Sequence, residues 1–325
     1  MRKNIILVTG CAGFIGFHTC KYLLKNTNNF LVGIDNMNKY YDFNLKKNRL
    51  SELNINKKFK YFKIDISNFN KLEKLFKQHK FSKVINLAAQ AGVRYSLKNT
   101  NTYLKSNIIG FYNLLELSKK HKIKHFLFAS SSSVYGNNKI PHKESDSTDK
   151  PLSFYAATKK TNEILSYPYA YLYNLKITGI RFFTVYGPYG RPDMALYKFV
   201  DNLLNKKNIE LYNFGQHIRD FTYIDDVTKG ISKILNKPPK GNTPFEIINI
   251  GRGKPEHLNS FLNKILSELG IVKPNIVNKK IQSGDVLSTF ASTNKLFKMY
   301  KFKPSIDIES GIKKFVQWYR EYYKK

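Results

Sequence analysis

The sequence predicts a doubly wound α/β fold, in which helices cover both faces of a parallel sheet, followed by a smaller mixed α/β C-terminal region. Short runs of β-branched and aromatic residues alternate with stretches whose apolar residues recur every three or four positions. After about Ile180 this rhythm gives way to turn-rich segments and longer loops. Alternation of strands and helices favours a parallel sheet with right-handed crossovers, which leaves few topologies.

Each element follows from its own pattern. Five β-branched and aromatic runs are predicted to be buried strands: IILVTG, FLVGID, FKYFKID, KVINLAA and HFLFASS. The segments FNKLEKLFKQH, IGFYNLLELSKK and IESGIKKFVQWYREYYKK have the spacing of amphipathic helices. The segment FTYIDDVTKGISKIL is predicted to form a strand and then a helix capped by Asp225, and FEIINIG another strand. Both strands are expected to rejoin the main sheet, which predicts one domain of residues 1–182 plus 220–252 and another of residues 183–219 plus 253–325.

Composition excludes several classes of protein. With 325 residues that are 42% hydrophobic and 14% aromatic, the chain is not disordered and can bury a substantial core. No apolar stretch approaches the ~20 residues of a membrane-spanning helix. The net charge of +32 is spread through every segment, which favours solvated basic faces over a nucleic-acid-binding stripe. We therefore expect no nucleic-acid partner and no membrane partner.

Cysteine and histidine usage point to a reducing compartment without a metal site. Cys11 and Cys20 lie in one turn-and-helix region and cannot build a disulfide framework, so we expect a cytoplasmic protein. None of the seven histidines stands in a metal-ligand pattern such as HExxH, and no metal is predicted.

A glycine turn follows the first predicted strand, with the spacing GxxGxxG. Gly10 permits the tight turn, Gly13 allows close approach of a pyrophosphate, and Gly16 allows helix and strand to pack closely. The helix that begins near Phe14 and Ile15 presents oriented N–H groups to the phosphates. This arrangement is typical of the Rossmann dinucleotide-binding fold, although glycines that merely pack a helix on a strand give the same spacing.

An acidic residue supports the dinucleotide interpretation. Asp35 closes the second predicted strand, 19 residues after Gly16, where a carboxylate accepts the ribose 2′-hydroxyl and repels a 2′-phosphate. This favours NAD over NADP. Asp65, after the third strand, either caps a helix or faces the adenine. Ile66, just after the third predicted strand, and Ala88, near the end of the fourth, are expected at the same cofactor site.

A serine cluster, a tyrosine and a lysine supply the chemistry. The cluster of residues 130–133 follows the fifth strand, and Tyr155 and Lys159 lie four residues apart on a predicted helix, hence on one face. A nearby ammonium favours phenolate over phenol, and a hydroxyl can orient a substrate alcohol while the phenolate takes its proton. A YxxxK pair alone is common by chance, but its combination with the glycine turn is specific.

With these residues the chain resembles the extended short-chain dehydrogenase/reductases that epimerise nucleotide sugars, and among them the UDP-glucuronate 4-epimerases. The resemblance spans nearly the whole chain and is carried by five ordered segments: NKYYDFNLKKNRL, NLAAQAGVRYS, SSSSVYG, RFFTVYGPYGRPDMAL and RDFTYIDDV. It implies that Ser131 is the catalytic hydroxyl, with Ser132 as an alternative, that Tyr155 is the base and that Lys159 is its partner. Tyr155 and Lys159 then also contact the NAD cofactor. The resemblance further implies an NAD-binding first domain and a UDP-sugar-binding second domain.

The same resemblance bears on the reaction and on the sugar. Related dehydratases carry Asp-Glu before VYG and related decarboxylases carry Glu, whereas this chain has Ser132 and Ser133, so we expect hydride removal at C4 and its return to the other face of a 4-keto sugar. Thr184 and Arg191 resemble the positions that hold the substrate carboxylate, which suits a guanidinium because its donors form a planar fork.

The remaining substrate residues rest on the resemblance alone. Arg219 resembles the diphosphate ligand of the family, Arg94 lies near the substrate, and Asp285 either belongs to the nucleotide pocket or forms a turn. The resemblance also implies a homodimer and a place in polysaccharide biosynthesis. Pro168 falls inside the helix that follows Lys159, which puts the geometry of that dimer in question.

Two other functions stay open at this level. The first is a 4-epimerase of the same mechanism that acts on a neutral or N-acetylated UDP-hexose. The second, from a different class, is a non-catalytic NAD-binding module, which the retention of Ser131, Tyr155 and Lys159 argues against.

Overall fold

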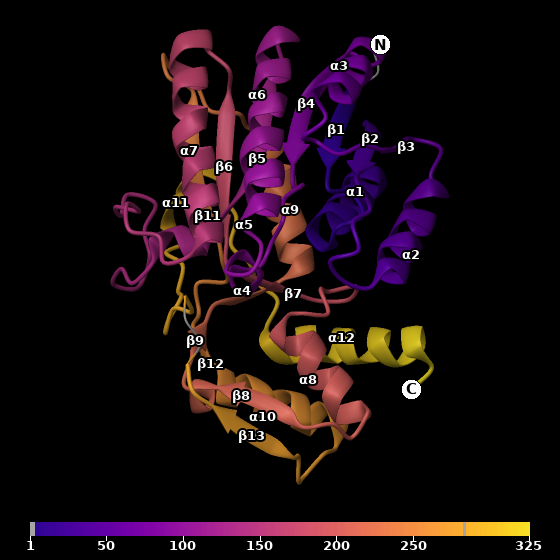
Figure 1. The fold of residues 1–325 in the computed structure, drawn as a ribbon, viewed down its shortest axis with the longest axis vertical. Helices are drawn as coiled ribbons and strands as arrows, with labels where there is room; N and C mark the ends of the chain where they lie inside the picture. The colour runs from indigo at the N-terminus through magenta and orange to yellow at the C-terminus, as the bar shows by residue number, and fades with distance from the viewer. Residues whose placement is uncertain (1–3, 282–283) are drawn as a thin grey trace. The chain divides into compact units, whose positions relative to one another are not determined.

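A computed structural model describes residues 4–281 and 284–325 of the chain (Figure 1). The chain forms two compact units: the first contains residues 1–136, 147–182 and 228–248, and the second residues 137–146, 183–227 and 249–325. Residues 137–146, 220–227 and 249–252, which the sequence analysis placed in the first domain, group here with the second unit.

A seven-stranded sheet organises the first unit. Its strand order is β11-β6-β5-β4-β1-β2-β3, and the pairings from β6 through β3 are all parallel. The strands are β1 (Ile5–Thr9), β2 (Phe30–Asp35), β3 (Phe59–Lys63), β4 (Phe81–Asn86), β5 (His125–Ser131), β6 (Ile177–Phe182) and β11 (Phe245–Ile250). The predicted doubly wound parallel sheet is therefore confirmed, as is the return of the FEIINIG strand to it.

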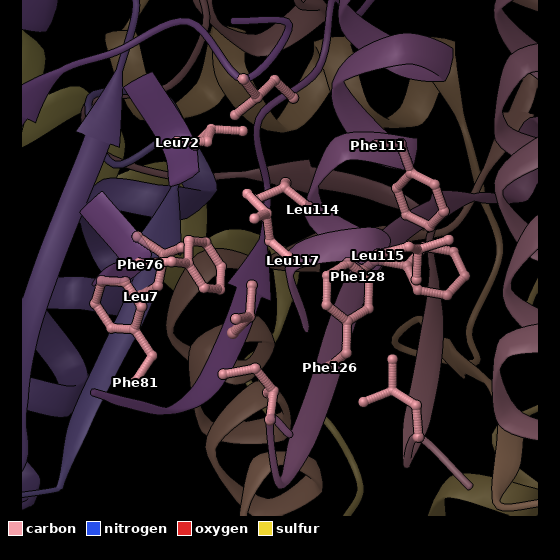
Figure 2. Packing of buried hydrophobic residues seen from close by; sticks show 14 of the residues in the cluster. Leu7, Leu72, Phe76, Phe81, Phe111, Leu114, Leu115, Leu117, Phe126 and Phe128 are labelled. Atoms are coloured by element: carbon pink, nitrogen blue, oxygen red, sulfur yellow. The ribbon is translucent and has the colours of Figure 1, made fainter. Parts of the chain in front are cut away.

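The helices between these strands carry their apolar residues at helical spacing. They are α1 (Phe14–Asn26), α2 (Phe43–Asn54), α3 (Phe69–Gln78), α4 (Val93–Ser96), α5 (Thr100–Tyr103), the π-helix η1 (Leu104–Ile109), α6 (Gly110–Lys120), the 3₁₀ turn η2 (Ser132–Tyr135) and α7 (Phe154–Tyr173). Figure 1 shows α3, α6 and α7 running side by side along the sheet, where α6 packs against both α3 and α7. Buried leucines and phenylalanines of α3 and α6, including Phe76, Phe111 and Leu114, belong to one core cluster with Phe126 and Phe128 of β5, drawn in Figure 2.

The second unit is built from short strands and longer helices. Its elements are β7 (Thr184–Tyr186), α8 (Ala195–Leu204), β8 (Ile209–Tyr212), η3 (Asn213–Gly215), β9 (Ile218–Arg219), β10 (Phe221–Tyr223), β12 (Glu256–His257), α10 (Leu258–Leu269), β13 (Ile276–Lys279), α11 (Asn294–Tyr300) and α12 (Ile308–Tyr323). The strands pair two by two, β10 with β7, β12 with β9 and β13 with β8. Phe221 and Phe261 stack with their ring centroids 3.9 Å apart in its core. The predicted C-terminal amphipathic helix is confirmed as α12.

Two expectations about the segment 221–235 are wrong. The strand β10 pairs with β7 in its own small sheet and does not rejoin the main one. The helix α9 (Ile224–Leu235) begins before Asp225, so this residue lies inside the first turn and does not cap the helix. A strand of three residues carries too little pattern to specify its partner, and an acidic residue suits a first turn as well as a cap.

Candidate active site

The glycine turn between β1 and α1 has the geometry that its spacing predicts. Gly10 has φ +69°, and a Cβ there would lie 2.7 Å from the backbone nitrogen of Ala88. A Cβ on Gly16 would lie 2.0 Å from the carbonyl oxygen of Gly10. Packing within the protein therefore requires glycine at both positions, and it brings Ala88 next to the turn.

Gly13 is less tightly enclosed by the protein than these two glycines. A Cβ on Gly13 would approach only the Gly10 carbonyl group, at 3.0 Å, and no other part of the chain within 4 Å. Gly13 is also the N-terminal cap of α1 and provides no side-chain cap, so the helix begins at Phe14 and Ile15 with its N–H dipoles unscreened by a side chain. These residues fit the diphosphate of a dinucleotide such as NAD.

Acidic residues follow the second and third strands. Asp35 is 8% exposed at the end of β2, and its Oδ1 accepts a hydrogen bond from the Met37 amide at 2.8 Å. Asp65 accepts from Asn36 Nδ2 at 2.9 Å and from Ser67 Oγ at 2.7 Å. Burial raises the pKa of Asp65, but these hydrogen bonds outweigh it and hold the pKa below its usual value.

The structure excludes one of the two roles considered for Asp65, that of a helix cap. The N-cap of α3 is Asn68, whose side chain accepts from the Lys71 amide, so Asp65 does not cap this helix. Its assignment to the adenine stays a prediction. Ile66, beside it, is buried and accepts a hydrogen bond from Asn113 through its backbone carbonyl.

Sequence reasoning missed a buried arginine beneath the glycine turn. Arg49 of α2 is fully buried, and its Nη1 donates to the carbonyl oxygen of Ala12 at 2.8 Å and to Tyr41 Oη at 2.7 Å. One turn earlier, Lys46 Nζ donates to the backbone and side-chain oxygens of Asn38, three residues after Asp35. The only signal in the sequence was a lysine and an arginine at helical spacing within NKYYDFNLKKNRL.

The lysine and tyrosine of the YxxxK pair lie one turn apart on α7. Lys159 is buried, its Nζ donates to the carbonyl oxygen of Ala129 at 2.8 Å, and it lies 5.9 Å from the centroid of the Tyr155 ring. Burial lowers the pKa of Lys159 to about 8. An ammonium held this way is poised to lose its proton in mildly alkaline solution.

The serine cluster is fixed at the end of β5. Ser131 Oγ accepts from the Ser133 amide and pairs with Ser133 Oγ, both at 3.2 Å, while Ser132 begins the turn η2. Ser130 Oγ donates to Glu163 Oε1 at 2.6 Å, and Arg181 of β6 forms a two-point ion pair with Glu163. Because Glu163 follows Lys159 by one turn, α7 is tied to two successive residues of β5. Glu163 is a second residue that sequence reasoning missed.

In the second unit, one pocket contains both residues assigned to a substrate carboxylate. Thr184, at the start of β7, and Arg191 line a small, partly open pocket together with Phe221, Phe315 and other apolar side chains. Arg191 forms a two-point ion pair with Asp193, with Nε 3.0 Å from Oδ1. Asp193 is a third residue that the sequence analysis did not single out.

Arg219 and Asp285 are brought to the same segment of the second unit. Arg219 donates from Nη2 to the Val286 carbonyl oxygen at 2.8 Å and from Nη1 to the Leu287 carbonyl oxygen at 3.0 Å. Asp285, immediately before them, lies in this loop and is partly exposed. Arg94 is exposed on α4 of the first unit.

Comparison with known proteins decides the family. Residues 6–251 match the model of the NAD dependent epimerase/dehydratase family. The chain belongs to this family. Among similar proteins, Protein CapI of Staphylococcus aureus is 45% identical over 336 residues, covering 98% of this chain and 99% of the relative. The UDP-glucuronate 4-epimerase of Thermodesulfobacterium geofontis is 44% identical over 316 residues, covering 97% and 96%. A crystal structure of UDP-glucuronic acid 4-epimerase from Bacillus cereus, in complex with UDP-glucuronic acid and NAD, is 33% identical with a TM-score of 0.92, covering 98% of this chain and 100% of that one.

Membership of the epimerase/dehydratase family makes NAD the cofactor of this chain. Among residues 4–281 and 284–325, no group of three or more histidines, cysteines or acidic residues is placed to hold a metal ion. Cys11 and Cys20 are both buried and form no disulfide. None of the helices in this part of the chain is long and apolar enough to span a membrane.

Proposed function

We propose that this protein is a UDP-glucuronate 4-epimerase, which interconverts UDP-glucuronate and UDP-galacturonate through a transient 4-keto sugar. The observation that carries the sugar assignment is the pocket shared by Thr184 and Arg191 in the second unit. The Ser131, Tyr155 and Lys159 arrangement in the first unit supports the epimerase chemistry, as does the name of the Thermodesulfobacterium relative.

The residues of the first unit would move one proton and hold one cofactor. NAD, when bound, supplies a hydride acceptor that takes the C4 hydride and returns it. Gly10, Gly13, Gly16 and Asp35 hold its diphosphate and ribose. Tyr155 takes the proton of the 4-hydroxyl group and later gives it back, while the Lys159 ammonium favours the phenolate and Ser131 orients the hydroxyl.

The residues of the second unit would hold the carboxylate still. The 4-keto intermediate is a β-keto acid, and it loses CO₂ when the bond from C5 to the carboxylate stands perpendicular to the carbonyl plane. A carboxylate held by the Arg191 guanidinium and the Thr184 hydroxyl cannot turn freely into that orientation. The residues before Val134 are Ser132 and Ser133, so this loop carries no acid to drive elimination of water.

The remaining assignments complete the proposal. Arg219 and the loop of Asp285 would bind the diphosphate and the nucleotide, and Arg94 the sugar. We propose that the protein is a cytoplasmic homodimer and that its product is used in polysaccharide biosynthesis. The dimer is supported by apolar side chains exposed on α6 and α7, among them Tyr112, Ile164 and Tyr171 at 47%, 57% and 64% exposure. Pro168 lies within α7, which continues past it to Tyr173.

One experiment tests the function. Purified protein is incubated separately with UDP-glucuronate, UDP-glucose and UDP-N-acetylglucosamine, and the sugar products are identified by NMR. Conversion of UDP-glucuronate alone to its 4-epimer, without net NADH, is the expected result. Preferential conversion of either other sugar would establish the neutral or N-acetylated UDP-hexose epimerase instead. A Tyr155→Phe variant is the matched control, and equal turnover by this variant would contradict the assigned base.

A further inference from the structure

The loop that carries Arg191 is held in an unusual backbone conformation. Tyr189 has φ +55°, in the left-handed region that non-glycine residues rarely adopt. Its ring packs on α12, with the centroid 4.9 Å from that of Trp318 and 5.7 Å from that of Tyr322. Aromatic packing against α12 therefore offsets the backbone strain at Tyr189. Such strain is typical of loops that hold one side chain in a fixed position.

The same loop provides Arg191 with an acidic partner two residues away. Asp193 accepts from Nε through Oδ1 at 3.0 Å and from Nη2 through Oδ2 at 2.5 Å. Side chains at this spacing usually point apart, but here the amide of Met194 donates to the carbonyl oxygen of Arg191 at 3.1 Å and closes a turn. The side chains of Arg191 and Asp193 are 20% and 31% exposed, so solvent weakens the pair less than at an open surface.

We propose that Asp193 is a positioning residue, which fixes the plane of the Arg191 guanidinium so that this group holds the substrate carboxylate in a single orientation. This inference rests on the proposed function of the Thr184 and Arg191 pocket. Arginine has many side-chain rotamers, and an ion pair through Nε and Nη2 restricts the guanidinium to one plane. A guanidinium fixed in advance binds a carboxylate at lower entropic cost than a mobile one.

The orientation of the carboxylate matters because decarboxylation of the 4-keto intermediate competes with its reduction. In the 4-keto intermediate, breaking the C5–C6 bond releases CO₂ and leaves its electron pair in the C4 enolate, which then takes a proton at C5 to give UDP-4-ketopentose. A mobile guanidinium can follow the carboxylate into the orientation that permits this step, whereas a fixed one cannot. Loss of Asp193 should therefore weaken binding of the carboxylated sugar and divert the intermediate.

A positioning role for Asp193 and a role as a competing ion predict opposite changes in the affinity for UDP-glucuronate when Asp193 is removed. If Asp193 merely occupied Arg191 until the substrate displaced it, its removal would tighten binding of UDP-glucuronate. If it positions Arg191, its removal loosens that binding and leaves a neutral sugar unaffected.

The test compares Asp193→Ala and Asp193→Asn with the unmodified holoenzyme. Calorimetry measures the affinities for UDP-glucuronate and UDP-glucose, and NMR measures the shares of 4-epimer and of decarboxylated UDP-pentose products. For Asp193→Ala we expect about three- to tenfold weaker binding of UDP-glucuronate, unchanged binding of UDP-glucose and a larger decarboxylated share. Asp193→Asn should fall between, because its amide oxygen still accepts one hydrogen bond. Asp149→Ala, at a side chain that is 75% exposed, serves as the control and should match the unmodified protein.

The outcomes separate this inference from the proposed function. Unchanged or tighter binding of UDP-glucuronate by both variants, or an unchanged product ratio, would overturn the positioning role while the epimerase assignment stands. If the unmodified protein does not epimerise UDP-glucuronate, the function fails. A selective loss of UDP-glucuronate affinity in Asp193→Ala would then still support the positioning role on a carboxylate-binding pocket.

Discussion

Replacing Lys159 with methionine should make the folded protein more stable at neutral pH while it strongly lowers kcat. Burial lowers the pKa of this lysine from its usual 10.5 to about 8, so at pH 7 the folded state holds an ammonium in surroundings that disfavour it. Methionine fills a similar volume without a charge. The prediction separates the cost of the lysine to folding from its benefit to chemistry.

The size of the effect follows from the pKa shift. One pKa unit corresponds to ~1.4 kcal/mol, so the shift from 10.5 to about 8 places roughly 3 kcal/mol of destabilisation on the charged form. The substitution also removes the hydrogen bond to the Ala129 carbonyl oxygen, a loss of about 1–3 kcal/mol. We therefore expect Lys159→Met to be more stable at pH 7 by about 1 kcal/mol, and its kcat to fall by about 100-fold or more.

The pH dependence is the decisive part. Above pH 8 the folded protein loses the Lys159 proton while the unfolded chain keeps it up to about pH 10.5, so the unmodified protein gains stability across this window. Lys159→Met has no lysine to deprotonate and does not gain this stability. Its higher free energy of unfolding relative to the unmodified protein should therefore vanish by pH 10. Urea denaturation at several pH values with saturating NAD measures this, with Lys74→Met, at an exposed lysine of α3, as the control. A difference between the proteins that stays constant from pH 7 to 10 would refute the reasoning.

Three further outcomes are expected. Burial lowers the pKa of His125 to about 4, so stability should fall by roughly 3 kcal/mol as pH drops from 6.5 to 4, and His125→Asn, followed by thermal melts, should lack this dependence. Gly16→Ala should lose bound NAD, measured in the purified protein by its absorbance after denaturation, since the new Cβ would lie 2.0 Å from the Gly10 carbonyl oxygen; full retention of NAD would contradict the turn geometry. Arg49→Met should weaken NAD binding about tenfold or more by freeing the Ala12 carbonyl, whereas Tyr41→Phe should cost less, as fluorescence titration would show; equal affinities would dismiss a role for Arg49.

Local patterns predicted most of the first unit and the segments of the site that are continuous in sequence. The glycine turn, Asp35 and the pair of Tyr155 and Lys159 could be found because each role depends on neighbours within a few residues or on a fixed spacing. Alternating strands and right-handed crossovers likewise predicted a parallel sheet, but they left several strand orders open.

The residues that were missed act through distant or irregular backbone. Arg49 reaches the Ala12 carbonyl 37 residues away, and Glu163 meets Ser130 across 33 residues, contacts that no local spacing encodes. Asp193 is close in sequence to Arg191, but only the turn closed by Met194 brings the two side chains together. The pairing of β10 with β7 escaped prediction because three-residue strands specify no partner.

The chain passes from one compact unit to the other five times, after residues 136, 146, 182, 227 and 248. Neither unit can therefore be produced alone by trimming a terminus, because a chain that keeps every segment of one unit also keeps at least two segments of the other. Exchange of substrate preference with a relative would require grafting three separate stretches at once. A gene fusion or an inserted tag is safest at the ends of the polypeptide, and truncation libraries should yield few soluble fragments.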